Sequence, residues 1–376
     1  VNNDVNLAKT ELSEALKHHE DFAKARLLLA DLHLRSRDFD FAIEESQKVL
    51  KLVPENVQAH LILGNSLLYK GQIADAQREF EEVVRLAPES PEGYYRMGLI
   101  YKIQRKFPES LQQFETALSH NPNLINVLSQ IISVYVRMKE PQKAILRCQK
   151  QLKLSPDNAF IYHLMGGVFL LQKDEKKGEE SFLKAIELNP NMLPSYLQLG
   201  RLYGRENRYG EAILQYEEAL KVNPKLLPAY TLLGVIYDQQ GEYEKATKIY
   251  EEALKIDPQF APIANNLAWN YAEHGGNIDV ALTLAQTAKE KLPEDPNISD
   301  TLGWIYYKKN VFKRAIALFK ESIEKIPDNP VVHYHLGMAY YKDGNTVKAK
   351  EELAKSLELS KDFDGAKEAK ETLEKL

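Results

Sequence analysis

The sequence contains a single cysteine, Cys148, among its 376 residues. One thiol allows no disulfide framework, no set of cysteines around a zinc ion and no haem attachment motif. No apolar run reaches the roughly 18 residues that a membrane span needs, so we expect no membrane-spanning helix. The chain begins with Val1 rather than Met, which together with the lone cysteine favours a soluble protein of the bacterial periplasm over one of the cytoplasm.

An excess of basic charge is also missing. The 49 Lys and Arg residues face 54 Asp and Glu residues, which gives a net charge of −5 without any basic block. Nucleic-acid binding needs a basic surface that neutralises phosphates. We therefore expect no nucleic-acid partner.

Sequence signals of catalysis are absent as well. The glycines never form the G-x-G-x-x-G or G-x-x-x-x-G-K patterns that bind phosphates. His333 and His335 are two residues apart, so on a helix their rings point in nearly opposite directions, whereas a metal pair needs a spacing of four. Cys148 falls at an apolar position without a nearby base, which favours packing over nucleophilic chemistry. We expect no enzyme activity, no metal site and no cofactor.

What the sequence does contain is a strict period. Nine prolines are separated by 34 residues, apart from one gap of 35 between Pro258 and Pro293. Such a period indicates one small structural unit repeated along the chain rather than a mosaic of domains. The prolines are Pro54, Pro88, Pro122, Pro156, Pro190, Pro224, Pro258, Pro293 and Pro327.

Each unit, numbered so that the proline is position 32, has the same apolar pattern. Position 8 is Gly or Ala in nine of the ten units, and position 20 is Ala, Ser or Gly in all of them. Aromatic residues recur at positions 11 and 24. The stripe at positions 4, 7, 8 and 11 predicts one helix, and positions 20, 24 and 27 predict a second. A turn separates them, and the proline ends the second helix because it disfavours helical geometry in the preceding residue.

This pattern resembles the tetratricopeptide repeat (TPR) family of bacterial type over essentially the whole chain. The resemblance implies an all-α fold, a TPR α-α superhelix formed as a right-handed solenoid of antiparallel helix pairs. We expect an N-terminal half-repeat helix at 1–22, with Ala8 and Ala15 facing inward, and a C-terminal capping helix at 364–376. Between them we expect ten units at 23–56, 57–90, 91–124, 125–158, 159–192, 193–226, 227–260, 261–295, 296–329 and 330–363.

Two units depart from the pattern. The fourth has Ile132 at position 8, Cys148 at position 24 and Gln151 at position 27, so its packing is expected to be looser or slightly rotated. The eighth has its extra residue within 273–277, a turn with two glycines close to Trp269. That turn is either a contact point for a partner or a neutral insertion.

The family resemblance implies a concave groove lined by positions 2, 5, 9 and 12 of the first helices. Trp269 and Trp304, the only tryptophans, both occupy position 9. They either bind a partner or fill space between repeats. The carboxylate clamp of some TPR domains is not matched, because Leu61 and Leu197 stand where basic residues are needed. The candidate partner-binding residues are Asn265, Asn266, Trp269, Asp300, Trp304, Tyr307, Tyr334, Met338 and Tyr341.

The sequence therefore favours a non-enzymatic scaffold that docks other proteins and helps to assemble a multiprotein complex. Its partner would be an extended peptide, a helix or the subunits of a larger complex. One alternative is a self-associating structural or filament component, against which the polar capping helix argues. Another is a regulatory TPR domain of a larger protein.

Overall fold

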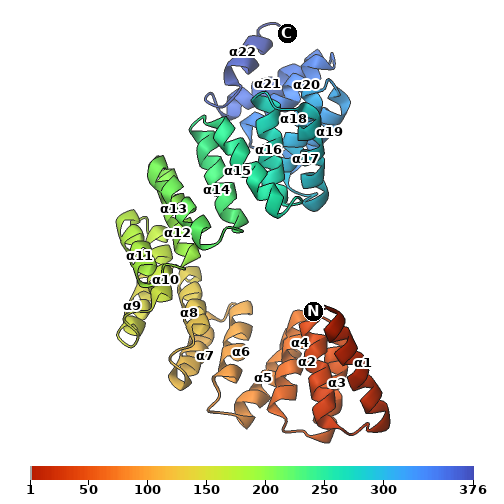
Figure 1. Cartoon of the computed structure of the whole chain (residues 1–376), viewed down its shortest axis with the longest axis vertical. Coiled ribbons are helices and arrows are strands. Elements are labelled where there is room, and N and C mark those ends of the chain that lie inside the picture. The colour runs from red at the N-terminus through yellow and green to blue at the C-terminus, as the bar shows by residue number, and fades with distance from the viewer. Residues whose placement is uncertain (1) are drawn as a thin grey trace. The chain divides into compact units, whose positions relative to one another are not determined.

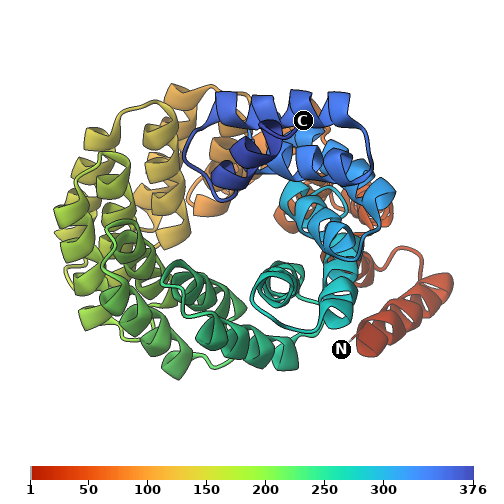
Figure 2. The same ribbon diagram turned by 90° about the horizontal axis from the view of Figure 1, so that it is seen from above.

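The computed structural model describes residues 2–376, with side chains from residue 4 onward, and this part of the chain contains helices but no strand. It divides into two compact units, one ending at Leu188 and one spanning Asn189–Leu376. We call them the N-terminal unit and the C-terminal unit. Within each unit, antiparallel helix pairs stack side by side (Figures 1 and 2).

The N-terminal unit contains eleven of the described helices. They are α1 (Asn2–His18), α2 (Ala23–Arg35), α3 (Phe39–Leu52), α4 (Val57–Tyr69), α5 (Ile73–Leu86), α6 (Pro91–Ile103), α7 (Phe107–His120), α8 (Ile125–Arg137), α9 (Pro141–Leu152), α10 (Ala159–Leu171) and α11 (Glu175–Leu188).

The C-terminal unit contains the other eleven. They are α12 (Leu193–Arg205), α13 (Tyr209–Val222), α14 (Leu227–Gln239), α15 (Tyr243–Ile256), α16 (Ala261–Glu273), α17 (Ile278–Lys291), α18 (Pro296–Lys308), α19 (Phe312–Lys325), α20 (Pro330–Lys342), α21 (Thr346–Leu359) and α22 (Ala366–Leu373).

The boundaries of these helices follow from local chemistry. Asn56 and Asn329 accept hydrogen bonds from backbone N–H groups in the first turns of α4 and α20, at 2.9 Å each. Such side-chain caps satisfy donors that have no partner within the helix. Second helices end in extended backbone before a proline, as at Asn223 (φ −137°) and Asp257 (φ −139°). The expected role of the prolines in ending these helices is thus confirmed at both positions.

A close approach of the two helices explains the small residue at position 8. A Cβ on Gly98 would lie 2.5 Å from the ring of Phe114, and one on Gly234 would lie 2.2 Å from the ring of Tyr250. Both aromatic residues occupy position 24 of the same unit. The Ser110 hydroxyl, at position 20, donates a hydrogen bond of 2.8 Å to the carbonyl oxygen of Gly98. The pair therefore packs a buried ring against a bare stretch of backbone.

Counting from α2 and α3, the fourth helix pair is α8 and α9. Its large and small residues at positions 8 and 24 are exchanged. Ile132 and Cys148 are both buried, so a large residue at position 8 faces a small one at position 24. Gln151 is buried too, and its side-chain amide donates to the Pro122 carbonyl at 2.7 Å. Burial raises the pKa of the Cys148 thiol to about 12, as befits a packing role.

The first helix has a different register from the one expected. Ala15 is exposed, whereas Leu16 is 6% exposed and packs with Leu12, Ala25 and Leu29. The prediction that Ala15 faces inward is therefore wrong by one residue. Leucine buries more apolar surface than alanine, and that difference decides which side of α1 faces α2.

The turn between the helices of each pair contains one residue in the left-handed region. In the C-terminal unit these residues are Asn207, Gly241, Gly275, Asn310 and Gly344, the types that tolerate positive φ best. In the N-terminal unit they are Arg37, Gly71, Arg105, Lys139 and Lys173. An ordinary side chain in this conformation costs about 1 kcal/mol relative to glycine.

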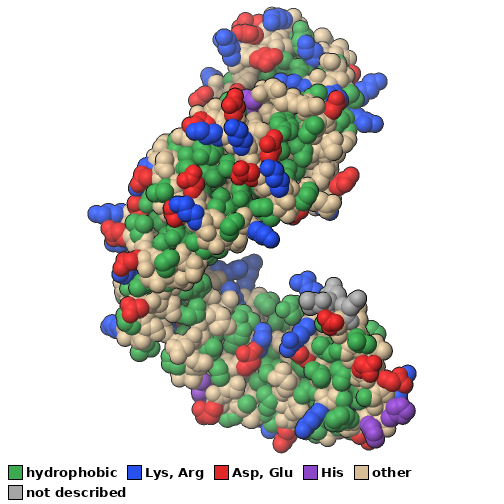
Figure 3. Space-filling view, viewed as in Figure 1, with side chains coloured by type: hydrophobic (Ala, Val, Ile, Leu, Met, Phe, Trp, Pro, Cys, Tyr) green, Lys and Arg blue, Asp and Glu red, His purple; other side chains and the backbone are tan. Residues whose placement is uncertain are grey.

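The surface is chemically mixed. On the face drawn in Figure 3, acidic and basic side chains are interspersed with exposed hydrophobic ones. In the described part of the chain, no helix is both long and apolar enough to cross a membrane.

Candidate functional site

We call the helix that opens each pair its first helix and the one that closes it its second helix. The candidate residues lie on the first helices of the last three pairs of the C-terminal unit, α16, α18 and α20. Trp269 is on α16, Trp304 and Tyr307 are on α18, and Tyr334 is on α20. They share one face because positions 5, 9 and 12 follow one another at intervals of four and three residues, each about one turn of the helix. We call Trp269, Trp304, Tyr307, Tyr334 and the adjacent His335 the aromatic cluster.

Ring contacts join the members of the aromatic cluster. Trp304 lies at its centre, with ring centroids 4.1 Å from His335, 4.7 Å from Tyr307, 6.0 Å from Tyr334 and 6.4 Å from Trp269. Such aromatic pairs each contribute about 0.5–1.5 kcal/mol beyond the burial of their area. Trp304, Tyr334 and His335 are buried in this unit, and the half-buried Trp269 and Tyr307 pack against them.

Polar groups fix the orientation of the Trp304 and His335 rings. The indole N–H of Trp304 donates to Glu273, whose carboxylate also lies 3.0 Å from the Lys308 ammonium. His335 is 3% exposed, and its Nδ1 lies 2.8 Å from Oδ1 of Asp300. Buried polar groups on aromatic rings need such partners. The rings of Trp304 and His335 are consequently each held in one orientation.

The C-terminal helix α22 covers one side of the aromatic cluster. The Tyr334 hydroxyl donates to Glu368 at 2.6 Å, and the Phe363 ring centroid is 6.0 Å from that of Tyr334. Burial, followed by the nearby Glu368 carboxylate, raises the pKa of Tyr334, and in the same order raises that of Tyr307 to about 12. Both phenols are thus protonated at neutral pH, and that of Tyr334 donates to Glu368.

A second polar network joins α14, α15 and α16, and Asn266 hydrogen-bonds to one of its members, Tyr250. Asp238 on α14 accepts hydrogen bonds from the Tyr250 hydroxyl at 2.7 Å and from the Asn270 amide at 2.6 Å. Burial raises the pKa of this carboxyl group, against the effect of these hydrogen bonds. The Oδ1 atom of Asn265 is buried and has no partner among the described residues. A buried acceptor without a donor is costly, and this oxygen is closed to an incoming group unless the half-buried side chain turns.

The structure thus divides the predicted site into two sets. Trp304, Tyr334 and Met338 are buried, with exposed fractions of 7%, 4% and 2%. Of the two tryptophans, for which the sequence left packing and partner binding open, Trp304 is thus buried among its neighbours. The half-buried set, which can still contact a partner, comprises Asn265, Asn266, Trp269, Asp300, Tyr307 and Tyr341. A binding role for either set stays a prediction.

The longer turn at 273–277 lies beside the aromatic cluster, as its position in the sequence suggested. It begins at Glu273, the residue that binds the indole of Trp304. The exposed His274 ring stacks on Tyr243, and Gly275 has φ +88°. The turn therefore helps to hold the cluster in place.

Sequence reasoning missed His335, Glu273 and Glu368. The available signal was the spacing between Asp300 at position 5 and His335 at position 6 of the next unit, since first helices of consecutive units are neighbours. Among the described residues, no group of three or more His, Cys, Asp or Glu side chains is arranged to hold a metal ion.

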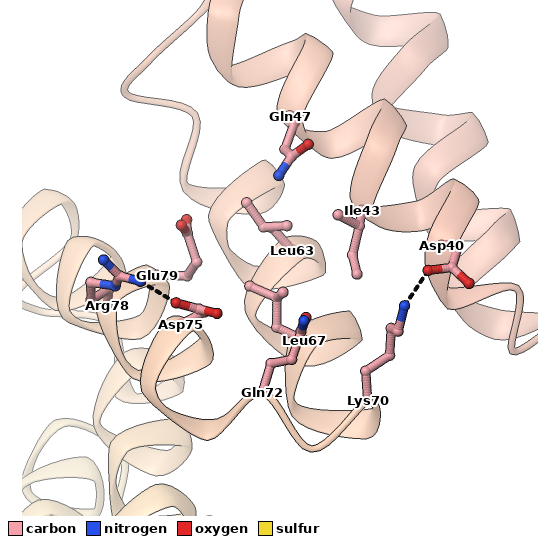
Figure 4. Close-up of a pocket in the computed structure, with 10 residues that line it drawn as sticks. All are labelled: Asp40, Ile43, Gln47, Leu63, Leu67, Lys70, Gln72, Asp75, Arg78 and Glu79. Atoms are coloured by element: carbon pink, nitrogen blue, oxygen red, sulfur yellow. Dashed lines mark hydrogen bonds and ion pairs between the residues drawn. The ribbon is translucent and has the colours of Figure 1, made fainter.

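A separate pocket of about 530 Å³ lies in the N-terminal unit between α3, α4 and α5. Figure 4 shows that its charged side chains pair with one another, Lys70 with Asp40 and Arg78 with Asp75. Leu63 and Leu67 form its floor. Because its charges are already neutralised in pairs, this pocket offers little to a charged ligand.

Comparison with known protein families finds matches along most of the chain. Models described as tetratricopeptide repeat match residues 228–260, and 161–192 with 331–363. A model described as TPR repeat matches residues 200–241 and 303–344. Residues 23–136 match a model described as the TT21 fifth ARM repeats domain. No curated protein matches the chain.

Solved structures resemble the chain in fold. The Cut9–Hcn1 hetero-tetramer of the APC/C aligns with a TM-score of 0.56 at 14% identity, over 100% of this chain and 87% of that one. A tetratricopeptide repeat protein from Parabacteroides merdae aligns with a TM-score of 0.49 at 16% identity, over 66% and 96%. The TPR protein YrrB, described as having an unusual peptide-binding site, aligns with a TM-score of 0.40 at 25% identity, over 51% and 99%.

The likeness to Cut9–Hcn1 shows a shared fold, and the tetratricopeptide repeat matches at 161–192, 228–260 and 331–363 each cover one helix pair. With its tandem antiparallel helices and its repeat matches, the chain is a tetratricopeptide repeat protein with many repeats.

Proposed function

We propose that this protein is a non-enzymatic scaffold that docks partner proteins and helps to assemble or stabilise a multiprotein complex. The observation that carries this proposal is the half-buried Trp269 at the edge of the aromatic cluster. Its indole rests on Trp304 and His335, with ring centroids at 6.4 and 5.9 Å. A preorganised aromatic residue with an open face is the typical anchor of a protein interface.

The surroundings of Trp269 suit a peptide or a helix. Asn265 lies one turn before it on α16 and has a buried side-chain oxygen without a donor. When this half-buried side chain turns, its oxygen can accept a hydrogen bond from a partner's backbone N–H group while the partner's apolar side chain packs on the indole. The buried rings beneath keep Trp269 in place, so the surface loses little conformational entropy on binding.

Substitution of Trp269 tests the proposal. The full-length protein is immobilised and used to capture partners from a lysate of its native organism, and captured proteins are identified by mass spectrometry. We expect Trp269→Ala to weaken the captured complex by about 2 kcal/mol, the usual scale of an interface hot spot. The dissociation constant is then measured with the purified partner.

The control removes an exposed aromatic side chain elsewhere. Phe41 is 59% exposed on α3, so Phe41→Ala should leave capture of the same partner unchanged. Equal capture by wild-type protein and the Trp269→Ala variant would show that the interface does not include Trp269. A circular dichroism spectrum that stays helical excludes unfolding as the cause of lost binding.

A further inference from the structure

The turns of the N-terminal unit contain cations where the C-terminal unit has Asn and Gly. The left-handed position is Arg37, Arg105, Lys139 or Lys173 in four of the five N-terminal turns, and Lys70 precedes the glycine of the fifth. Glycine or asparagine adopts this conformation more easily. The choice of Arg and Lys is therefore not explained by the backbone.

These turns share one edge of the N-terminal unit. Successive first helices pack against each other, as α2 does against α4 and α8 against α10, and a second helix returns between them. First helices therefore run in the same direction and end at the same edge. The side chain of Lys70 reaches Asp40 of the preceding pair, and the Gln104 amide donates to Gln77 at 2.9 Å. We call this row of turns the basic turn edge: residues 35–38, 69–72, 103–106, 137–140 and 171–174.

Charge on the basic turn edge is strongly unbalanced. It contains eight Lys and Arg residues against three Asp and Glu residues, whereas the corresponding stretches of the C-terminal unit contain five against four. Many cations elsewhere on the described surface pair with a carboxylate three or four residues away, as Lys48 does with Glu44. No carboxylate of the described residues pairs with the exposed side chains of Arg37, Arg105, Arg137, Lys139 and Lys173.

Like charges also meet on the adjoining helix face. Lys102 on α6 donates to Gln130 at 2.7 Å and to Ser133 at 2.9 Å, neither of which is an anion. Its pKa is lowered by burial and by the positive charge of Arg137 on α8. Cations that face one another without an anion form an attractive site for a negatively charged group.

Exposed apolar side chains alternate with these cations. Tyr69, Ile103 and Leu171 each stand two residues before a left-handed residue and are 71%, 53% and 64% exposed. The corresponding positions of the C-terminal unit hold only polar or charged residues, from Arg205 to Lys342. Large apolar side chains this exposed, in a row with unpaired cations, mark an interaction surface.

A pocket at the N-terminal end of this edge combines both features. It has a volume of about 310 Å³, and the Phe39 and Tyr69 rings, 5.1 Å apart, stack on one of its sides. Three guanidinium groups line it, of which Arg35 pairs with Asp31 and Arg96 with Glu92, while Arg37 has no anionic partner among the residues that the structure describes. Guanidinium groups bind carboxylates through paired hydrogen bonds. The pocket therefore fits an acidic group beside an apolar side chain.

We propose that the basic turn edge binds an acidic segment of a partner protein, whose apolar side chains pack on Tyr69, Ile103 and Leu171. This inference rests on the proposed scaffold function and adds the chemical class of one partner, at a surface separate from the aromatic cluster. Carboxylates of the segment neutralise the unpaired Arg and Lys side chains. The charge complementarity provides both the attraction and the preference over neutral sequences.

The test uses a fluorescein-labelled peptide of Glu and Asp with Leu residues at intervals, titrated with the full-length protein and followed by fluorescence anisotropy. The variant Arg37→Gly, Arg105→Gly, Lys139→Gly, Lys173→Gly removes four cations while suiting the positive φ. We expect this variant to bind the peptide at least ~10-fold more weakly than wild type, and wild-type binding to weaken as salt rises.

The matched control is Asn207→Gly with Asn310→Gly, which makes the same backbone change in the C-terminal unit without changing charge. It should bind the peptide as wild type does. Tyr69→Ala should weaken binding with all cations present, and a peptide with Gln in place of Glu and Asn in place of Asp should bind at least ~10-fold more weakly.

Equal affinity of wild type and the fourfold variant would overturn the proposal, and so would equal affinity for the neutral peptide. The proposal would also be overturned if single-stranded DNA or vesicles containing phosphatidylserine bound more tightly than the acidic peptide and the fourfold variant lost that binding. The edge would then bind those anions instead. Trp269→Ala should not change peptide affinity. A failed peptide titration with successful Trp269-dependent capture would therefore refute this inference and leave the scaffold function standing.

Discussion

At the scale of single residues, glycine has two different roles in this chain. Gly98 lies against the ring of Phe114, which has no exposed surface, so a methyl group there has no room. Gly167, one residue after the packing glycine of α10, has no neighbouring atom within 4 Å of where its Cβ would lie. The repeat pattern identifies the first role, because Gly98 is at position 8. It gives no reason for the second.

We predict opposite effects for alanine at these two glycines. Gly98→Ala should lower the free energy of unfolding by about 1–3 kcal/mol, because the ring of Phe114 must move. Gly167→Ala should raise it by about 0.5–1 kcal/mol, because alanine is favoured in a helix interior. Urea denaturation of each variant measures both. Similar destabilisation by the two substitutions would contradict the packing that the structure shows.

At the scale of elements, side chains join neighbouring helices at points that the apolar pattern does not reveal. His333 on α20 is buried, with Nδ1 2.6 Å from Glu352 of α21 and Nε2 2.9 Å from the carbonyl oxygen of Pro327. Two acceptors suit an imidazolium with both nitrogens protonated. The pKa of His333 is raised by the hydrogen bond to Glu352, which outweighs burial and the opposing charge of Lys355.

This raised pKa predicts how the stability of the C-terminal unit depends on pH. The folded state binds the proton more tightly than the unfolded state, so the contribution is complete below the unfolded value of 6.5. It is lost as pH rises through the higher pKa of the folded state. The free energy of unfolding should therefore fall in this range, as measured by urea denaturation at a series of pH values.

Two variants isolate this contribution. His333→Gln and Glu352→Gln should each flatten the dependence on pH, the first by removing the titrating group and the second by removing its anionic partner. A slope that is unchanged in both variants would assign the dependence to other groups.

At the scale of the whole molecule, the two units have separate spectroscopic reporters. Both tryptophans, Trp269 and Trp304, lie in the C-terminal unit, and the only cysteine, Cys148, lies in the N-terminal unit. Cys148 has no exposed surface, and burial raises the pKa of its thiol to about 12. A thiol reagent therefore reacts with it only after local or global opening. Tandem repeats contact mainly their neighbours, so unfolding need not be concerted.

We predict that substitutions in one unit shift mainly the reporter of that unit. Gly98→Ala should lower the urea concentration at which Cys148 reacts, with little change in tryptophan fluorescence. Gly234→Ala, whose Cβ would lie 2.2 Å from the Tyr250 ring, should do the reverse. If both reporters shift equally in both variants, the chain unfolds as one cooperative body.

The accuracy of the sequence predictions differs between parts of the chain for physical reasons. The helices α2–α21 follow from the repeat, since in seven pairs the glycine at position 8 lies against the side chain at position 24, and Ile132 with Cys148 inverts that contact. The register of α1 was wrong because one helix shows too few apolar positions to separate Ala15 from Leu16. The positive charge of the N-terminal turns was not recognised from the sequence, because the turns are about 34 residues apart and their cations form no continuous run.

The sequence alone determined the repeat, the two helices of each unit and the residues at which they meet, because these depend on local periodicity and on prolines that stop helices. Only the tertiary structure decided which candidate residues remain accessible. Trp304 is buried because Glu273, Tyr307 and His335, from three different helices or turns, converge on its ring. Trp269 has the same position in the repeat and stays half-exposed, since accessibility depends on what the neighbouring units place around it.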